Sequence, residues 1–192
     1  MTELETYIKS YFGVTEEDRT IIGSLFKLTN VQKGDYFLKS GRICDKLSFQ
    51  RSGLMRVFVV TEEKEVTQWI GAQGYFLTDL AGIIFDKPSK YTIQALTDCE
   101  LYTISREDYN SLGQLIPQWH ELEKRFIAHC FTYLEDRIFT LLSMSAEQRY
   151  QQLFETRKEL FNQVPLQYLA SMMGMTPETL SRIRKKGLGP TS

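Results

Sequence analysis

The chain has 192 residues, of which 42% are hydrophobic and 24% are charged. This length fits one large domain or two small ones, and the composition excludes a collagen-like, low-complexity or disulfide-stapled chain. The formal net charge of −1 gives, for the whole chain, no indication of a polyanionic partner such as nucleic acid.

The three cysteines, Cys44, Cys99 and Cys130, are far apart and form no CxxC pair, so we expect free thiols in a reducing compartment. The chain opens with Met-Thr-Glu-Leu-Glu and not with the basic and then apolar segment of a secretion signal. No apolar run approaches the roughly 20 residues that a membrane-spanning helix needs. The sequence therefore predicts a cytoplasmic protein with no membrane partner.

Two short helices are predicted at the start of the chain. The apolar residues of segment 2–12 recur at helical spacing and are followed by Gly13, which suits a helix end. Thr15 precedes three acidic residues, which is typical of an N-cap and a first helical turn, and this second helix is expected to end near Phe26.

Residues 27–105 are predicted to form a small all-β sandwich or barrel. Short β-branched and aromatic segments alternate there with glycine-bearing turns, at spacings of about 8–12 residues. The apolar run 78–85, which contains Gly82, predicts a short helix or a tight loop packed against this unit. The clearest predicted strands are 54–60, 66–70, 91–96 and 101–104.

From Ser105, a predicted N-cap, the sequence becomes helical. A segment opened by Pro117 runs for about 25 residues, roughly twice the usual helix length. We favour a dimer-forming helix, because its apolar stripe exceeds what a small β unit can cover; the alternative is a scaffold helix packed within one subunit. The apolar positions are Trp119, Leu122, Phe126, Ile127, Cys130, Tyr133, Leu134, Phe139, Leu141 and Leu142.

Ser145 and Gln148 form a capping-box pattern that predicts the start of a new helix. We therefore expect a break near 143–145 and three parts, residues 1–116, 117–144 and 145–192. The last part differs from the rest of the chain in net charge. Residues 147–192 carry a net charge of +3 and residues 1–146 carry −4, so the near-neutral total hides a basic C-terminal unit.

Residues 164–186 predict two helices joined by a tight turn at Gly174, with Thr176 as the N-cap of the second helix and Pro177 as its first residue. This pattern is typical of a helix-turn-helix; the alternative is an ordinary helical hairpin with a basic end. The apolar, inward-facing positions are Leu166, Leu169, Ala170, Met173, Leu180 and Ile183.

The polar face of the second helix suits double-stranded DNA. Arg182 would pair with guanine and Glu178 would accept a hydrogen bond from cytosine, while the terminal cations would contact phosphates. The candidate DNA-binding residues are Thr176, Glu178, Thr179, Ser181, Arg182, Arg184, Lys185 and Lys186.

With the segment 169–174 (LASMMG) and the following 176–186 (TPETLSRIRKK), the sequence resembles the Crp/Fnr family of bacterial transcription regulators, the relatives of the cyclic-AMP receptor protein. The resemblance covers nearly the whole chain. It implies an α+β fold, with an N-terminal double-stranded β-helix (a β-roll or jelly-roll of cyclic nucleotide-binding type) and flanking helices. A long dimerisation helix and a C-terminal all-helical helix-turn-helix domain would follow.

The resemblance also implies partners and base contacts. It implies a homodimer on a pseudo-palindromic operator, with RNA polymerase as a further candidate partner. The family's recognition helix typically carries Arg-Glu-Thr-x-x-x-Arg, in which the acid and the final Arg read bases. Glu178, Thr179 and Arg182 match this pattern, but Pro177 replaces the first Arg, so the operator is expected to differ. We also expect a wingless subgroup, because residues 187–192 are too few for the family's usual β-hairpin wing.

The family's nucleotide pocket uses a Gly-Glu step for the ribose, an Arg-Ser pair for the cyclic phosphate and a Thr-Ser pair for the adenine. All three sets differ here, so we do not expect cyclic AMP to bind. Either another effector occupies the pocket, or the β-roll serves as a structural and protein-contact domain. The residues at these positions, which are the candidate effector residues, are Thr78, Asp79, Ser89, Lys90, Leu134 and Glu135.

The sequence predicts no metal and no cofactor. Three scattered cysteines do not supply the four thiolates of an iron–sulfur cluster. His129 and Cys130, adjacent on a helix, point about 100° apart and cannot grip one metal together. A redox role of Cys130 across a dimer seam stays open as a minor alternative.

Two other classes of protein share parts of this pattern. A ligand-binding signalling module would have the same β-roll, but its helical end would contact protein and not DNA. A cupin-like enzyme would need clustered histidines and carboxylates on strands, whereas the two histidines, His120 and His129, lie on the predicted long helix. We therefore predict that the chain is not an enzyme.

Overall fold

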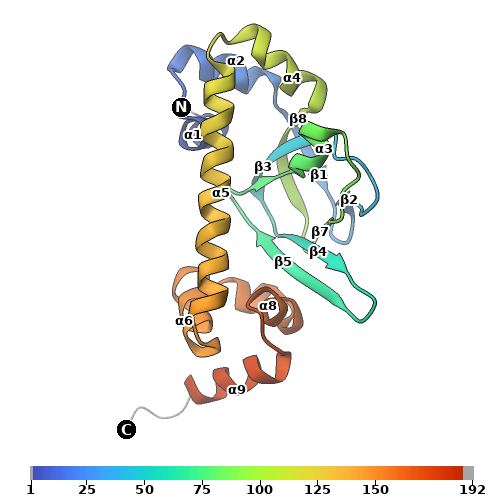
Figure 1. Cartoon of the computed structure of the whole chain (residues 1–192), viewed down its shortest axis with the longest axis vertical. Helices are drawn as coiled ribbons and strands as arrows, with labels where there is room; N and C mark the ends of the chain where they lie inside the picture. Colours follow the sequence, from blue (N-terminus) through green and yellow to red (C-terminus); the bar gives the residue numbers. More distant parts are fainter. Residues whose placement is uncertain (1, 188–192) are drawn as a thin grey trace.

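The computed structural model describes residues 2–187, which form a β-domain and a helical unit that are connected by one long helix (Figure 1). The chain begins with α1 (Glu3–Phe12) and α2 (Glu16–Leu25). Thr2 and Thr15 cap these helices, because each side-chain oxygen accepts a hydrogen bond from the backbone N–H three residues later. Gly13 ends α1 with a φ of 66°, as the sequence predicts.

Within the described residues, eight strands form two antiparallel four-stranded sheets. One sheet has the order β1-β8-β3-β6 and the other β2-β7-β4-β5. Their inner faces enclose a core that includes Phe37, Met55, Ile93 and Leu101. The strands are β1 (Lys27–Val31), β2 (Tyr36–Leu38), β3 (Lys46–Ser52), β4 (Met55–Val60), β5 (Glu65–Gly71), β6 (Phe76–Leu77), β7 (Thr92–Ala95) and β8 (Cys99–Ser105).

Between β6 and β7 the chain forms the short helix α3 (Leu80–Phe85), which settles the two alternatives that the sequence left open for this segment. Asp79 caps this helix, because its Oδ1 accepts a hydrogen bond from the backbone N–H of Ala81 at 3.0 Å. Gly82 lets α3 approach the loop before β3 closely. A Cβ at this position would lie 2.5 Å from the backbone nitrogen of Cys44.

The second half of the chain is helical, as predicted. Ser105 caps α4 (Arg106–Leu115), and α5 (Trp119–Ser143) is a single helix of 25 residues. A capping box of Ser145 and Gln148 starts α6 (Ala146–Thr156), so the predicted break near 143–145 is confirmed. The remaining helices are α7 (Leu160–Gln163), α8 (Leu166–Met172) and α9 (Pro177–Gly187).

One detail of the predicted helices is wrong. The long helix begins at Trp119, because Pro117 and Gln118 precede it in a turn. The segment 154–163 is helical and contains no strand, but residues 157–159 separate α6 from α7. Arg157 leaves the helical conformation there, and its Nη1 donates to the Tyr75 hydroxyl at 3.0 Å. The sequence predicts no hairpin in residues 187–192. Of these residues, 188–192 lie outside the described part of the chain.

Two further cores join the helices to the β-domain. In the first, Phe12 of α1 stacks on Phe126 of α5 with ring centroids 4.9 Å apart, and Phe49 of β3 is buried beside them. In the second, Ile70 of β5 packs with buried residues of the last helices, including Leu169. The β-domain is therefore held at one end by α1 and the first half of α5, and at the other by α8 (Figure 1).

We predict that Gly82→Ala destabilises the protein by about 1–3 kcal/mol, because the added methyl group would overlap the backbone of Cys44, which cannot rotate away. Urea denaturation monitored by circular dichroism measures this free energy of unfolding.

Gly23→Ala is the matched control, since Gly23 also lies inside a helix. The nearest atom to its new Cβ is the Ile8 Cδ1 at 3.8 Å, which is ordinary contact. This variant should be as stable as the wild type or up to about 1 kcal/mol more stable, because alanine favours helix. Equal stability of Gly82→Ala and the wild type would contradict the packing of α3.

Candidate functional site

α8 and α9 meet at a tight turn. Gly174 has a φ of 66°, and the backbone N–H of Met175 donates to the Ala170 carbonyl at 3.0 Å. Leu169 and Ala170 of α8 and Leu180 of α9 are fully buried against one another. The small Ala170 side chain allows the two helices to approach closely, and the left-handed glycine reverses the chain between them.

The start of α9 has the predicted cap. The Thr176 Oγ1 accepts a hydrogen bond from the Thr179 backbone N–H at 3.2 Å, and Pro177 is the first helical residue. Leu180 and Ile183 are buried on the inner side of the helix. Because these two side chains anchor α9, the opposite side of the helix faces solvent in a fixed orientation.

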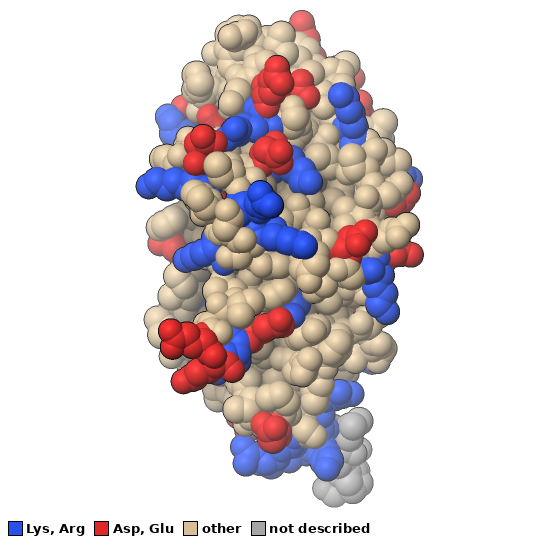
Figure 2. Space-filling view, turned by 90° about the vertical axis from the view of Figure 1, so that its right-hand side faces the viewer, with Lys and Arg blue, Asp and Glu red and all other residues tan. Residues whose placement is uncertain are grey.

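A shallow groove on the outer side of α9 is lined by Glu178, Ser181, Arg182, Lys185 and Lys186. Among these residues, Ser181 alone is half-buried and the others are exposed. Figure 2 shows Lys and Arg side chains gathered at the end of the molecule where α9 lies. The structure thus brings these five predicted residues together on one cationic face.

The other three predicted DNA-binding residues lie beside this face. Thr176 lines a neighbouring groove between the start of α9 and the β4–β5 hairpin. Thr179 and Arg184 are half-buried. Thr179 takes part in the helix cap, so its backbone N–H is already used.

Glu178 is an acceptor at neutral pH. Its own backbone N–H and the Thr176 hydroxyl stabilise the carboxylate and hold the pKa of Glu178 below its usual range. A carboxylate in the first turn of a helix is also favoured by the helix dipole. The outer face of α9 therefore combines one hydrogen-bond acceptor with several cations.

The helical unit is fastened to the β-domain by polar contacts that the sequence analysis did not find. The Arg137 Nη2 on α5 donates to the Gln68 carbonyl of β5 and to the Met172 carbonyl of α8, both at 2.7 Å. The Thr67 backbone N–H donates to the Ser171 Oγ of α8 at 2.9 Å. Because β5 is the last strand of its sheet, these contacts cover an edge that would otherwise be open.

Arg56 is a second fastening residue. Its side chain is only 2% exposed, and its guanidinium lies 3.6 Å from the ring centroid of Tyr168 on α8. Its Nε donates to the Thr67 Oγ1 at 2.9 Å and its Nη1 to the Glu65 carboxylate at 2.6 Å. An arginine inside the apolar strand 54–60 is the sequence signal that could have indicated this contact.

The second half of α5 carries an exposed apolar stripe. Phe131, Leu134, Ile138 and Leu142 are 61%, 46%, 56% and 82% exposed. Ile127, Phe131, Leu134, Ile138 and Leu141 follow the alternating spacing of four and three that is typical of a coiled-coil seam, and Leu142 lies next to Leu141. Two of them, Phe131 and Ile138, were absent from the predicted apolar positions, although this spacing marks them.

The candidate effector residues do not converge. The carboxylate of Asp79 caps α3, and the Ser89 hydroxyl is bonded to the backbone of Tyr91. The Lys90 ammonium lies over the Tyr91 ring, 5.0 Å from its centroid. On α5, Glu135 is exposed to solvent.

Two of the six candidate effector residues, Thr78 and Leu134, line a mostly apolar cavity of about 270 Å³ between the β-domain and α5. The Thr78 hydroxyl donates a hydrogen bond to the Lys46 carbonyl at 2.9 Å, so its proton is already engaged. The lining of this cavity includes His129 and Cys130 but none of the other four candidate effector residues.

No cluster of three or more His, Cys, Asp or Glu side chains suited to a metal occurs within residues 2–187. In the same range, no helix has the length and apolarity required to cross a membrane. His129 is exposed, with its ring edge-on to Tyr11, whereas Cys130 is half-buried beside the core of α1 and α5.

Comparison with known proteins agrees with this architecture. Residues 28–114 match the family model of the cyclic nucleotide-binding domain, so the chain contains a domain of this type. No curated protein matches the sequence significantly.

Several solved structures share the fold. A putative transcriptional regulator of the Crp/Fnr family from Eubacterium rectale aligns over 97% of this chain and 91% of its own, with a TM-score of 0.70 and 18% identity. The c-di-GMP-responsive global regulator CLP of Xanthomonas campestris aligns over 90% and 91%, with a TM-score of 0.68 and 17% identity. The cAMP-bound PfPKA-R fragment aligns over 57% of this chain but only 40% of its own, at a TM-score of 0.53 and 20% identity.

We predict that Cys130 reacts slowly with iodoacetamide in the folded protein. Burial raises the pKa of its thiol to about 11, so little of the reactive thiolate exists near neutral pH. At pH 8, alkylation should be about a hundredfold slower than in the chain unfolded by guanidinium, and the rate should rise with pH as the thiolate forms. Mass spectrometry of the Cys130 peptide measures both rates. Rapid alkylation at pH 7 would instead support the redox alternative.

Proposed function

We propose that the protein is a sequence-specific DNA-binding transcription regulator of the Crp/Fnr type. The single observation that carries this proposal is the α8–α9 pair. A glycine turn and a buried apolar seam hold α9 so that Glu178, Ser181, Arg182, Lys185 and Lys186 share one exposed face. The β-domain and the regulators of similar fold support the same reading.

In this proposal, α8 and α9 form a helix-turn-helix and α9 enters the major groove. Arg182 donates two hydrogen bonds to a guanine, and the ionised Glu178 accepts one from a cytosine amino group. Lys185 and Lys186 contact phosphates, which position the helix without reading sequence. In the alternative, the helical end of the chain contacts another protein. Such a contact would not require the four cations of α9 (Arg182, Arg184, Lys185 and Lys186) beside the single acid Glu178.

A second copy of the chain covers the apolar stripe of α5 in this proposal. Two stripes paired as a coiled coil would remove Phe131, Leu134, Ile138 and Leu142 from water. The two-fold symmetry of such a dimer calls for a pseudo-palindromic operator with half-sites about 34 Å apart.

In this proposal, the β-domain binds no cyclic AMP and no resident cofactor, and it catalyses no reaction. Cyclic AMP is disfavoured on chemical grounds, because a cyclic phosphate needs a cation that faces it. At the phosphate position, the Lys90 ammonium lies over Tyr91, and at the ribose position the Asp79 carboxylate caps a helix. RNA polymerase remains a candidate partner of the complex on DNA.

We predict that selection from random double-stranded DNA enriches a symmetric site, and that Arg182→Ala weakens binding to that site by about 1–3 kcal/mol, because one bidentate base contact is lost. Gel-shift titration at fixed salt measures the affinity. Lys185→Ala should weaken specific and non-specific binding equally and reduce the slope against salt by about one.

Arg125→Ala is the control for charge, since Arg125 is an exposed cation on α5, far from α9 in sequence. It should leave DNA affinity unchanged. Enrichment of no symmetric site, or an affinity that does not depend on salt, would favour the protein-contact alternative.

We predict that Ile138→Glu converts a dimer into a monomer, because a carboxylate in the paired seam would be buried without a partner. Sedimentation equilibrium measures the mass. Val60→Glu is the control, since Val60 is an equally exposed apolar residue at the end of β4, outside the stripe. It should leave the mass unchanged. A wild-type protein that is monomeric at all concentrations would contradict the proposed dimer.

A further inference from the structure

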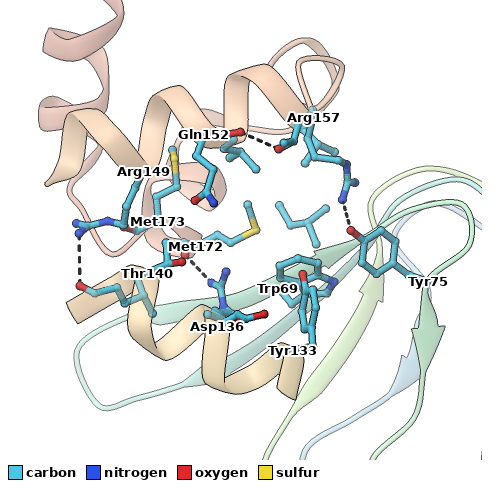
Figure 3. Close-up of a pocket in the computed structure, with 16 residues that line it drawn as sticks. Trp69, Tyr75, Tyr133, Asp136, Thr140, Arg149, Gln152, Arg157, Met172 and Met173 are labelled. Atoms are coloured by element: carbon cyan, nitrogen blue, oxygen red, sulfur yellow. Dashed lines mark hydrogen bonds between the residues drawn. The ribbon is translucent and has the colours of Figure 1, made fainter. Parts of the chain in front are cut away.

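A cavity of about 470 Å³ lies where the β-domain meets the helical unit (Figure 3). Its walls come from β5 of the β-domain and, at least 60 residues later in the chain, from α5, α6, α7 and α8. Its volume is within the range of ordinary small-molecule sites, about 300–1,000 Å³. None of the predicted effector or DNA-binding residues lines it.

One end of the cavity is aromatic. The Trp69 ring lies 5.4 Å from that of Tyr75 and 5.3 Å from that of Tyr133, measured between centroids. Met172 and Met173, at the C-terminal end of α8, extend the apolar wall toward the other end (Figure 3). The apolar part of a small ligand, such as an aromatic ring, would pack here against large and polarisable side chains.

The charged groups of the lining have an excess of positive charge. Three arginines, Arg137, Arg149 and Arg157, stand against one carboxylate, Asp136. The Arg137 Nη2 is used by backbone carbonyls of β5 and α8. All three guanidinium nitrogens of Arg149 likewise donate to backbone carbonyls, among them that of Met173.

Arg157 is different, because one of its nitrogens has no acceptor. Its Nε pairs with the Glu159 carboxylate at 3.0 Å and its Nη1 donates to the Tyr75 hydroxyl at 3.0 Å. Its Nη2 is buried and has no hydrogen-bond partner among the described residues, while the side chain is only 16% exposed. A buried cationic donor of this kind is costly unless a ligand supplies the missing acceptor.

We infer that this cavity binds a small organic anion, an aromatic carboxylate or a close equivalent. The carboxylate pairs with the Arg157 guanidinium, and the ring packs against Trp69 and the methionines of α8. This cavity adjoins the apolar cavity beside Thr78, and Trp69, Tyr75, Tyr133 and Arg137 line both, whereas Arg157 lines only the cavity at the joint. Binding there does not depend on the proposed binding of DNA. Because the ligand touches both β5 and α8, it also strengthens the joint between the β-domain and the helical unit.

The test uses 4-iodobenzoate as the probe and 4-iodobenzyl alcohol as its uncharged match. The iodine atom quenches tryptophan fluorescence on contact, and of the two tryptophans only Trp69 lines the cavity, since Trp119 is buried in the core of α1 and α5. We expect saturable quenching by 4-iodobenzoate at one site per chain. The alcohol should bind at least tenfold more weakly, and Trp69→Phe should abolish the quenching.

Arg157→Gln should weaken the probe's affinity at least tenfold, whereas Lys158→Gln, which removes the adjacent exposed cation, should not change it. Thermal unfolding checks that both variants fold. Because the comparison between acid and alcohol uses the wild-type protein, the inference stays testable if Arg157→Gln does not fold. Equal affinities for acid and alcohol, equal affinities of the two variants, or quenching that persists in Trp69→Phe would each overturn it.

Discussion

The rest of the structure depends on α5, a helix of 25 residues that reaches from the core with α1 to the helical unit (Figure 1). Its first half is buried through Trp119, Leu122 and Phe126 in a core with α1 and α4. Its second half leaves the core, and one guanidinium, that of Arg137, then holds backbone carbonyls of both β5 and α8. Burial lowers the pKa of Arg137 from its usual range, but the carbonyl acceptors compensate the buried charge. One helix thus connects the β-domain, the helical unit and an exposed apolar stripe.

The joint between the β-domain and the helical unit covers an open edge of one sheet. β5 is an edge strand, and an uncovered edge would present free backbone groups to other chains. Ser171 and Arg137 take up backbone groups of Thr67 and Gln68, while Tyr168 stacks on the buried Arg56. These contacts are polar and directional, so they orient α8, and through its turn they orient α9. The position of the cationic face follows from a strand edge more than 100 residues earlier in the chain.

The same joint creates the cavity at Arg157. Aromatic side chains of β5, the β5–β6 loop and α5 meet the methionines of α8 without filling the space between them. The interruption between α6 and α7 turns the Arg157 side chain toward Tyr75, which leaves one buried nitrogen without an acceptor. The inferred ligand site is therefore a product of how two units pack, whereas the residues at the positions of the family's nucleotide pocket lie on the β-domain and α5.

The sequence alone determined the features that depend on neighbours along the chain. Capping by Thr15, Ser105 and Ser145, the glycine ends of α1 and α8, and the length of α5 were all predictable, because each rests on hydrogen bonds or periodicity within a few residues. The outward face of α9 was predictable for the same reason, since buried and exposed positions of one helix follow its period.

Only the tertiary structure decided the contacts between distant segments. The role of Arg137 and the position of the Arg157 side chain depend on partners 69 and 82 residues away, and no local pattern reports such partners. The same limit applies to the candidate effector residues, which the family resemblance suggested as a pocket. In the fold, the Asp79 carboxylate caps a helix and the Lys90 ammonium lies over Tyr91, because the local hydrogen bonds and ring contacts of a short loop direct these side chains.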